Sequence, residues 1–350
     1  MQSFVDFDLT LGRQPPRLGA LLARIDVGCG REDLFADQLP QLLASLAEET
    51  RIASITASSA LEGVVVAPER AERIGSALGA GRFRNRNERE FAGYRDAIDG
   101  IVRADRQEEL SVLLILHLHR LLYAHGGGRG GYLKTEENLI VSYVEGRRAV
   151  LFTPVLPAET EFALTELVAR YNAAVGAEAA HPVVLVGALI LDFLAIHPFA
   201  NGNGRIARIL TTQQLLARGY GVPRYVSVEQ RIFESKNAYY DALYGSQREW
   251  HEGTHSVWPW IEYLAGVLAD AYALFEQRVA AGAGTRRLSK QQRVRVWVFD
   301  QAPARFRFRE IRRAVPGVSD ATIKLVLGEL RDEGLIEAER GGSQSEWRRL

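Results

Sequence analysis

The sequence predicts a mainly helical protein that contains one β-hairpin and ends in a small second domain of short helices and a hairpin. Three observations support this fold class. Apolar residues recur at spacings of three and four over most of residues 1–285, which is typical of amphipathic helices. Two short β-rich runs lie between Asn138 and Pro154. Residues 286–350 contain three further helical patterns and two strand-like runs.

Composition and charge limit the class of protein. The chain has 350 residues, 47% of them apolar, which is enough for a buried core and excludes a disordered chain or a disulfide scaffold. Its 43 basic and 43 acidic side chains give a net charge of zero, but they are unevenly distributed along the chain. Residues 286–350 hold 15 Lys or Arg and 9 Asp or Glu. The net charge is therefore +6 in this segment and −6 in the remainder, which restricts an expected nucleic-acid partner to residues 286–350.

We expect a soluble, cytoplasmic protein without a membrane span. The first residues, MQSFVDFDLTLG, lack the basic and apolar regions of a secretory signal. The most apolar stretch, residues 182–196, contains Asp192 and is too short to cross a bilayer. Cys29 is the only cysteine, which fits a reducing compartment and excludes a metal site built on cysteines.

The elements of the first 285 residues follow from local patterns. Apolar residues at helical spacing predict helices around residues 39–46, 91–98 and 110–118, and again at 185–196 and 206–216. The runs LIVSYV and AVLFT, separated by Glu145 and Gly146, predict a hairpin over residues 139–153. Residues 280–285, AAGAGT, have no large apolar side chain and predict a linker or a frayed helix end.

Residues 197–208, with the sequence HPFANGNGRIAR, form a tight loop between two predicted helices and the first turn of the second one. Gly202 and Gly204 allow the backbone to turn and its N–H groups to approach a ligand, and the helix adds its positive N-terminal end. Arg205 and Arg208 lie in that first turn, where a cation is unfavourable unless an anion compensates it. The loop therefore predicts a site for phosphate groups.

His197 ends the preceding helix and would face the same site. Its titration range suits it to remove a proton from a hydroxyl nucleophile, so the combination predicts phosphoryl or nucleotidyl transfer. Taken singly, a glycine loop often only caps a helix, and a lone histidine is more often structural. A base, an anion loop and two arginines within one short segment favour the functional interpretation.

This segment resembles the signature of the Fic family, HPFx(D/E)GNGRxxR, at every fixed position except Asn201. The resemblance implies a Fic-type helical bundle and the transfer of AMP from ATP to a Ser, Thr or Tyr hydroxyl of a protein, with release of pyrophosphate. It assigns the general base to His197 and the apolar anchor of the loop to Phe199. It implies that Gly202, Asn203 and Gly204 bind the phosphates of ATP. Arg205 and Arg208 would then lie on the side of the β- and γ-phosphates.

Asn201 departs from the acidic residue that helps to hold Mg²⁺ in the family. Its amide offers a neutral carbonyl oxygen in place of a carboxylate, so we expect metal binding through Asn201 to be weak. Weak activity, another nucleotide, and transfer of another group such as phosphate, UMP or a phosphorylated alcohol remain open.

Residues 58–63, SSALEG, fit the family's inhibitory pattern (S/T)xxxE(G/N), which begins here at Ser58. In that interpretation Glu62 pairs with Arg208 and blocks the γ-phosphate position, as expected for an arginine that lacks an anion when ATP is absent. In some relatives this glutamate also assists removal of AMP from the target. The alternative is a helix stopped by Gly63, with Glu62 in solvent.

Two flanking regions also resemble the family. The hairpin at 139–153 lies where the family has a flap that pairs with the target peptide as an added strand; the alternative is a merely structural hairpin. Residues 235–243, SKNAYYDAL, resemble the helix that borders the adenine. Asn237, Tyr239 and Tyr240 are therefore candidate base contacts, although aromatic residues at this spacing are more often part of a core.

Residues 286–350 resemble a winged helix-turn-helix domain. Ser289 caps a helix that runs through Val298, residues 309–315 form a second helix, Ser319 caps a third at 320–333, and residues 335–339 and 346–350 form a hairpin. A third helix and a net charge of +6 suit DNA binding. The third helix, however, carries acidic side chains, which would repel DNA phosphates, so a protein-docking or dimerising module is the alternative.

We therefore expect an N-terminal helical region with an inhibitory helix at 1–95, a Fic catalytic core at 96–280 and a winged helix at 286–350. The expected function is AMP transfer from MgATP to a protein hydroxyl docked on the hairpin, restrained by Glu62. The alternatives are a DNA-binding regulator whose core senses nucleotide with weak catalysis, and a Fic enzyme that transfers another phosphate-containing group. Removal of AMP by the same site and a homodimer also remain open.

Overall fold

Helices dominate the chain, as predicted, and form two units, residues 1–275 and 276–350. The computed structural model describes residues 2–5, 13–76, 83–104, 106–126, 129–144, 147–286, 289–340 and 346–350. Residues 1–95 belong to the same unit as the residues up to 275. Residues 280–285 continue a helix to Arg286 instead of forming a linker, because alanine favours a helix strongly enough to offset two glycines.

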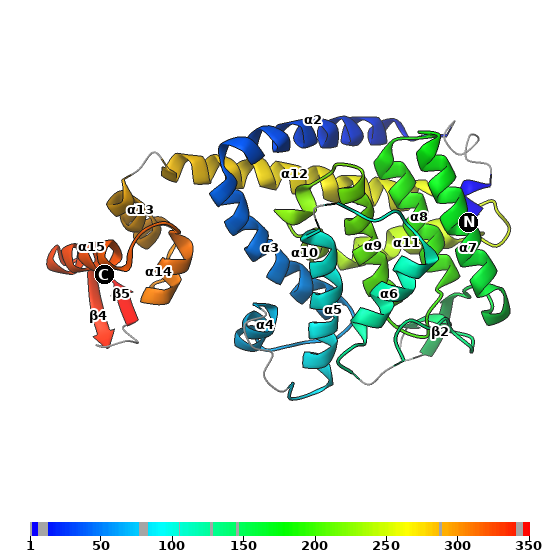
Figure 1. The fold of residues 1–350 in the computed structure, drawn as a ribbon, viewed down its shortest axis with the longest axis horizontal. Coiled ribbons are helices and arrows are strands. Elements are labelled where there is room, and N and C mark those ends of the chain that lie inside the picture. The colour runs from blue at the N-terminus through cyan, green and yellow to red at the C-terminus, as the bar shows by residue number, and fades with distance from the viewer. Residues whose placement is uncertain are drawn as a thin grey trace. The chain divides into compact units, whose positions relative to one another are not determined.

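The first unit consists of helices and one hairpin (Figure 1). Its elements in chain order are η1 (Gln2–Phe4), α2 (Pro16–Gln38), α3 (Pro40–Leu61), α4 (Pro68–Gly75), α5 (Arg86–Val102), α6 (Val112–Leu122), β1 (Ile140–Val144), β2 (Arg147–Phe152), α7 (Pro157–Gly176), α8 (Pro182–Ile196), α9 (Asn203–Ala217), η2 (Val222–Arg224), α10 (Val228–Glu234) and α11 (Lys236–Gln247). Helix α12 (Trp258–Arg286) begins in this unit and continues past its last residue, Phe275.

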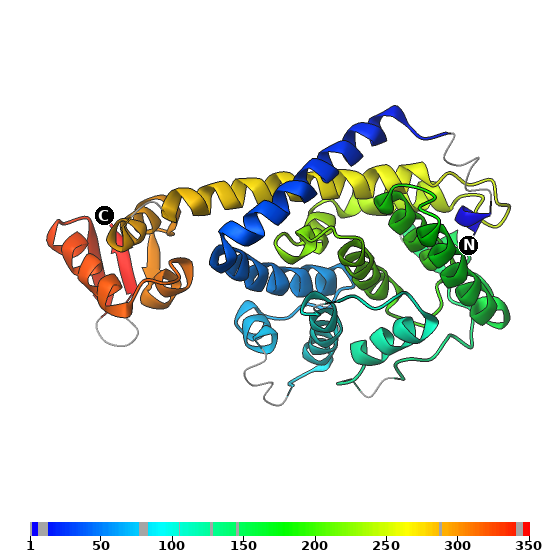
Figure 2. The same ribbon diagram turned by 45° about the horizontal axis from the view of Figure 1, so that its top comes forward.

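Helix α8 lies at the centre of the core and packs against α7 and α9 (Figure 2). Every residue from Val183 to Ile196 is buried, which explains why this stretch is the most apolar of the chain. Asp192 interrupts the apolar run, and its carboxylate accepts hydrogen bonds from the Ser3 hydroxyl (2.6 Å) and the Trp250 indole N–H (2.7 Å). Within the described parts of the chain, no helix combines the length and apolar character needed to cross a membrane.

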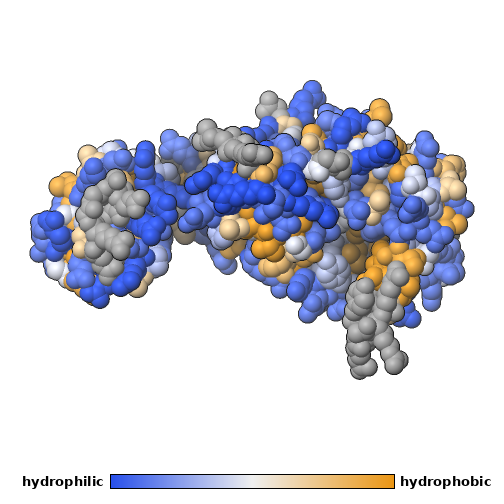
Figure 3. All heavy atoms as spheres, turned by 90° about the horizontal axis from the view of Figure 1, so that it is seen from below, coloured by the Kyte–Doolittle hydropathy of each residue, from blue (hydrophilic) through white to orange (hydrophobic). Residues whose placement is uncertain are grey.

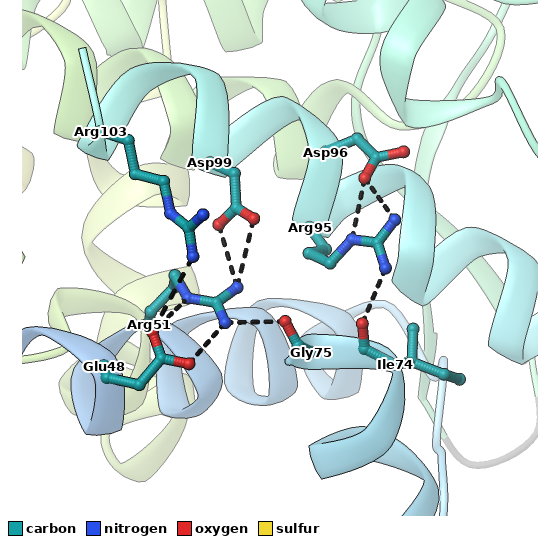
Figure 4. A network of polar contacts seen from close by, with 8 residues as sticks. All are labelled: Glu48, Arg51, Ile74, Gly75, Arg95, Asp96, Asp99 and Arg103. Atoms are coloured by element: carbon teal, nitrogen blue, oxygen red, sulfur yellow. Dashed lines mark hydrogen bonds and ion pairs between the residues drawn. The ribbon is translucent and has the colours of Figure 1, made fainter. Parts of the chain in front are cut away.

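A network of buried arginines joins α3, α4 and α5 (Figure 4). Arg51 on α3 binds Asp99 on α5 (3.0 Å) and donates to the Gly75 carbonyl at the end of α4 (2.7 Å). Arg95 on α5 donates to the adjacent Ile74 carbonyl (2.7 Å). Because the last carbonyls of a helix have no partner within it, two guanidinium groups stabilise the C-terminus of α4 and hold all three helices together.

Strands β1 and β2 form the predicted hairpin as an antiparallel pair, with Ile140 opposite Phe152 and Val144 opposite Arg147. The predicted turn residues, Glu145 and Gly146, lie outside the described residues. In the described structure this sheet has two strands, so each strand has one edge without a neighbouring strand. Figure 3 shows apolar side chains gathered on one face of the molecule among hydrophilic ones. Of the apolar residues at the hairpin, Leu139, Val150 and Leu151 are exposed.

The second unit combines short helices with a three-stranded antiparallel sheet. Its elements are α13 (Lys290–Val296), the π-helical turn η3 (Trp297–Gln301), β3 (Arg305–Arg307), α14 (Phe308–Ala314), α15 (Asp320–Asp332), β4 (Ile336–Arg340) and β5 (Glu346–Arg349). The strand order is β3-β5-β4. The three helices and the last two strands lie where the sequence predicts them, whereas β3 is too short for a periodic signal and was not predicted.

Candidate functional site

The loop between α8 and α9 turns through two left-handed residues. His197 ends α8 with φ 51°, and Gly202 precedes α9 with φ 85°. A Cβ atom at Gly202 would lie 3.0 Å from Leu122 Cδ2 and from the Tyr123 hydroxyl, so both the backbone angle and the space favour glycine. This geometry presents the N-terminus of α9 to the space that His197 borders, as an anion site requires.

His197 has a defined tautomer. Its Nδ1 lies 3.2 Å from the Leu194 carbonyl oxygen. Because a carbonyl only accepts, Nδ1 carries the proton and Nε2 carries the lone pair. Burial lowers the pKa of His197 to about 4, so the ring is neutral at pH 7 and its Nε2 can accept a proton.

Phe199 and Asn203 hold the loop from inside. The Phe199 side chain is fully buried. Its backbone N–H donates to Asn203 Oδ1 (2.9 Å), and Asn203 Nδ2 donates back to the Phe199 carbonyl (2.7 Å). Asn203 is 1% exposed. Both polar atoms of its side-chain amide bind the Phe199 backbone, so Asn203 holds the two ends of the loop together.

His119 on α6 is a site residue that the sequence did not indicate. Its ring stacks on Phe199 with centroids 3.7 Å apart. Its Nε2 donates to the Asn201 carbonyl (3.1 Å), and its Nδ1 accepts from the Gly131 N–H (2.8 Å). Burial lowers the pKa of His119 to about 4, which keeps the neutral form that both hydrogen bonds require. Helix α6 holds two histidines, and nothing in their spacing indicates that His119 makes this contact.

The segment before the hairpin lies along the loop. Lys134 is buried, and its Nζ donates to the Ile196 carbonyl (3.0 Å) and to Asn138 Oδ1 (2.8 Å). Asn138 Nδ2 donates to the carbonyls of His197 (3.1 Å) and Phe199 (2.7 Å). Burial lowers the pKa of Lys134 to about 8. These contacts hold the backbone carbonyls of Ile196, His197 and Phe199, and so fix the backbone at His197.

Arg208 is engaged by the end of α3. Its Nη2 binds Glu62 Oε1 at 2.9 Å, its Nε donates to the Ser58 hydroxyl at 2.8 Å, and both partners come from the predicted inhibitory segment. Helix α3 ends at Leu61 and Gly63 has φ 73°, so the helix stop predicted from Gly63 is also present. Glu62 is nevertheless directed at Arg208 and not at solvent, with 28% of its side chain exposed.

The Glu62 carboxylate also lies against the anion loop. A Cβ atom at Gly204 would lie 2.5 Å from Glu62 Oε1, so a larger residue there would displace the Glu62 carboxylate. Burial by itself would raise the pKa of Glu62, but the Arg208 guanidinium holds it below its usual value. Glu62 is therefore ionised at neutral pH and lies beside Gly204 in the first turn of α9.

Arg205 leaves α9 toward a different carboxylate. Its Nη1 binds Glu90 Oε2 on α5 at 2.8 Å, and its Nη2 donates to the Tyr123 hydroxyl at 3.2 Å. Its Nε is buried and has no hydrogen-bond partner within the described residues. Arg205 therefore retains one buried donor that a phosphate oxygen could satisfy. Glu90 was not predicted, because no spacing relates it to the loop.

The three residues proposed to border the base differ in exposure. Tyr239 on α11 is buried beside Trp260 and Tyr263, and burial raises its pKa to about 12. Tyr240 is 49% exposed. Partial burial raises the pKa of Tyr240, and the nearby Glu62 carboxylate adds a smaller rise. Asn237 is exposed. The structure thus gives Tyr239 a core position and leaves Tyr240 and Asn237 accessible to a ligand.

The described residues do not supply the usual protein ligands of Mg²⁺. Asn201 is exposed and offers one neutral oxygen. The two nearby carboxylates, Glu62 and Glu90, are paired with arginines, and no group of three His, Cys, Asp or Glu lies together in the described part of the chain. Since Mg²⁺ in proteins is normally held by carboxylates together with substrate phosphates, an ion here would depend mainly on the phosphates.

Comparisons with known proteins agree on one family. Residues 109–215 match the Fic/DOC family model. Over 128 residues the chain is 33% identical to the protein adenylyltransferase and cysteine protease IbpA of Histophilus somni, a match that covers 35% of this chain and 3% of that protein. It is 29% identical over 100 residues to a Fido domain-containing protein of Dictyostelium discoideum, covering 29% of this chain and 68% of that protein.

A solved structure has the same fold. The Fic family protein of Desulfovibrio desulfuricans G20 superposes with a TM-score of 0.60 at 20% identity, covering 96% of both chains. The predicted Fic-type helical fold is therefore confirmed, and the loop at 197–208 lies inside the matched family segment.

Proposed function

Because residues 109–215 are a Fic/DOC family domain, we propose that the protein transfers AMP from ATP to a Ser, Thr or Tyr hydroxyl of another protein. One observation carries the proposal. A buried, neutral His197 with a free Nε2 borders a glycine loop whose second arginine, Arg208, is already bound to the carboxylate of Glu62. An anion site, a base and an internal carboxylate that occupies the site together fit a restrained nucleotidyl transferase.

In the proposed reaction, His197 Nε2 accepts the proton of the target hydroxyl, and the hydroxyl oxygen attacks the α-phosphorus of ATP. A bond forms between that oxygen and phosphorus, the bond to the β-phosphate oxygen breaks, and pyrophosphate leaves. The N–H groups at the start of α9 and the unpartnered Nε of Arg205 orient the phosphates. ATP is expected to enter as its Mg²⁺ complex, because the protein supplies few ligands for the metal.

Glu62 is proposed to restrain the reaction by holding Arg208 and the position of the γ-phosphate. ATP must then displace a charge-assisted hydrogen bond, which is worth about 1.5–3 kcal/mol, before it binds productively. In some relatives of the family this glutamate also assists removal of AMP from the target, and the same reaction is proposed for this site. The edge of the β1–β2 hairpin, with exposed Val150 and Leu151, is the proposed docking site for the target chain.

A labelling experiment tests this function. We expect Glu62→Gly to incorporate AMP from labelled ATP into itself or into lysate proteins about tenfold or more faster than the wild type, because the displaced carboxylate is gone. Glu49→Gln, an exposed carboxylate on the same helix, is the matched control and should behave like the wild type. Mass spectrometry of the labelled protein should show the mass of AMP.

The double variant Glu62→Gly/His197→Ala separates catalysis from binding. It should bind ATP by calorimetry but transfer nothing, because the base is missing. If Glu62→Gly labels no protein, or if the double variant labels as well as Glu62→Gly does, the enzymatic proposal is wrong. Another added mass would identify a different transferred group.

A second candidate function is a nucleotide-sensing DNA-binding regulator. In the second unit the arginines of β3 and α14 are exposed, namely Arg305, Arg307, Arg309, Arg312 and Arg313. Two carboxylates of α15, Glu329 and Glu333, are paired with Arg295, which reduces their repulsion of phosphates. Gel-shift titrations with and without ATP would favour this candidate if DNA binding is tight, responds to nucleotide and is accompanied by no transfer.

A further inference from the structure

A cavity of about 720 Å³ opens beside the anion loop and is not used by the proposed reaction. Its wall contains Ala200 and Asn201 of the loop, His119 and Tyr123 of α6, and residues 132–135. Gly202, Gly204 and Arg208, which would receive the nucleotide phosphates, are not among its lining residues. The cavity is therefore a neighbour of the nucleotide site with a wall of its own.

The charge of this cavity is strongly positive. Four of its described lining side chains are cationic, namely Arg86, Arg89, Arg129 and Lys134, and one, Glu90, is acidic. Glu90 is divided between Arg86 (2.5 Å) and Arg205 (2.8 Å), so it does not neutralise the remaining cations. Within the described residues, the guanidinium groups of Arg89 and Arg129 have no hydrogen bond or ion pair. Cations gathered around one concave surface raise the local concentration of anions.

The position of the cavity relates it to the target chain. Lys134 and Thr135 line it, Asn138 donates to the carbonyls of His197 and Phe199, and β1 begins at Ile140. The same short segment thus passes from the cavity, beside the base, to the hairpin. A peptide that pairs with the hairpin and offers its hydroxyl to His197 has this cavity as a neighbour for the residues that flank the acceptor.

We propose that this cavity binds acidic side chains of the protein substrate, next to the residue that is modified. The inference rests on the proposed function and specifies the class of its substrate. A carboxylate can take two parallel hydrogen bonds from a guanidinium, a geometry that Arg89 and Arg129 have available. Tyr132, which is 69% exposed, and Leu133 offer apolar surface to the stems of such side chains.

Two synthetic peptides test the proposal with the full chain in the absence of nucleotide. Both carry one acceptor tyrosine; in one it is flanked by Asp and Glu, and in the other by Asn and Gln. Fluorescence anisotropy should show the acidic peptide binding about tenfold more tightly at moderate salt. Arg89→Gln/Arg129→Gln should remove most of that difference, whereas Arg17→Gln, an exposed arginine on α2 outside the cavity, should preserve it.

Two results would overturn the proposal. Equal binding of the two peptides, or an unchanged preference in a double variant that retains its unfolding temperature, means that the cavity does not select acidic side chains. If inorganic pyrophosphate displaces the acidic peptide and the double variant loses pyrophosphate binding, the cavity is a site for free phosphate instead. The peptide experiment measures binding and not AMP transfer. Its result therefore tests the acidic preference of the cavity separately from the proposed AMP transfer.

Discussion

Arg205 and Arg208 lie on the same helical turn, yet their guanidinium groups bind carboxylates from different helices. Arg208 meets Glu62 at the end of α3, and Arg205 meets Glu90 on α5. Each cation at the N-terminus of α9 is thereby compensated by a local anion. ATP would have to compete with Glu62 for Arg208, whereas the buried Nε of Arg205 has no hydrogen-bond partner among the described residues.

The first residue-scale prediction concerns His119. His119→Phe retains an aromatic ring against Phe199 but loses the hydrogen bonds to the Asn201 carbonyl and the Gly131 N–H. In the Glu62→Gly background we expect kcat to fall about tenfold, since loss of these bonds lets the loop depart from the geometry that transfer requires. The variant leaves the Asn201 carbonyl and the Gly131 N–H without these partners. The free energy of unfolding should therefore fall by about 1–3 kcal/mol.

Single-turnover AMP transfer and calorimetric ATP affinity, measured side by side, check this prediction. His117→Phe, two residues away on the same helix, is the control and should leave the transfer rate unchanged. A His119→Phe variant with an unaltered kcat would show that the loop holds its geometry without His119.

At the scale of elements, close approach of α2 to α12 places a carboxylate in the interior. A Cβ atom at Gly28 would lie 2.6 Å from the Tyr272 ring, so glycine permits the contact. One turn later, Glu32 is 7% exposed and accepts a hydrogen bond from the Tyr272 hydroxyl (3.3 Å). Burial raises the pKa of Glu32 to about 7, with Asp33 adding to the rise and Arg224 opposing it.

A pH-dependent stability follows from Glu32. The folded state binds a proton more tightly than the unfolded state, whose glutamate pKa is 4.5, so stability is lost as the pH rises from about 4.5 to about 7. Glu32→Gln should therefore raise the free energy of unfolding at pH 8 by roughly 3 kcal/mol and have little effect at pH 4. Urea unfolding of the wild type and of Glu32→Gln at pH 8 and at pH 4 measures this change in the free energy of unfolding. An equal change at the two pH values would show that the pKa of Glu32 is not raised.

At the scale of the whole molecule, the two units have separate cores. The core of the second unit consists of residues between Val294 and Ile336, with Phe308 and Trp347 packed against it. Phe306 is 1% exposed and pairs with Trp297, with ring centroids 5.6 Å apart. Stability of this unit should therefore depend on its own residues, and the chain need not unfold in one transition.

Phe306→Ala tests this separation. The cavity left behind should destabilise the second unit by about 3–5 kcal/mol. In differential scanning calorimetry one transition should move to lower temperature while the other stays, and AMP transfer by the Glu62→Gly background should be unchanged at temperatures below the first transition. Leu164→Ala, in the first unit, should shift the other transition. A single transition shifted equally by both variants would mean that the units unfold together.

Most helices and both hairpins were predictable because their signals are local. Apolar spacing located the helices at 39–46, 91–98 and 185–196, and alternating β-rich runs located the hairpin at 139–153. The short strand β3 and the π-helical turn η3 were not predicted, since a three-residue strand is stabilised by its neighbour β5 and a π-helical turn depends on packing. For residues 280–285 the sequence left a linker and a helix end open, and the structure has the end of α12 there.

The sequence alone determined the loop at 197–208, because its glycines, base and arginines are contiguous and their functional meaning does not depend on distant residues. It also indicated the pairing of Glu62 with Arg208, through a short motif upstream. Only the tertiary structure decided that Arg205 pairs with Glu90, that His119 and Asn138 hold the loop, and that four cations surround one cavity. These hydrogen bonds and ion pairs join residues 61 to 115 positions apart. Helix packing brings such partners together, so the sequence contains no spacing pattern that relates them.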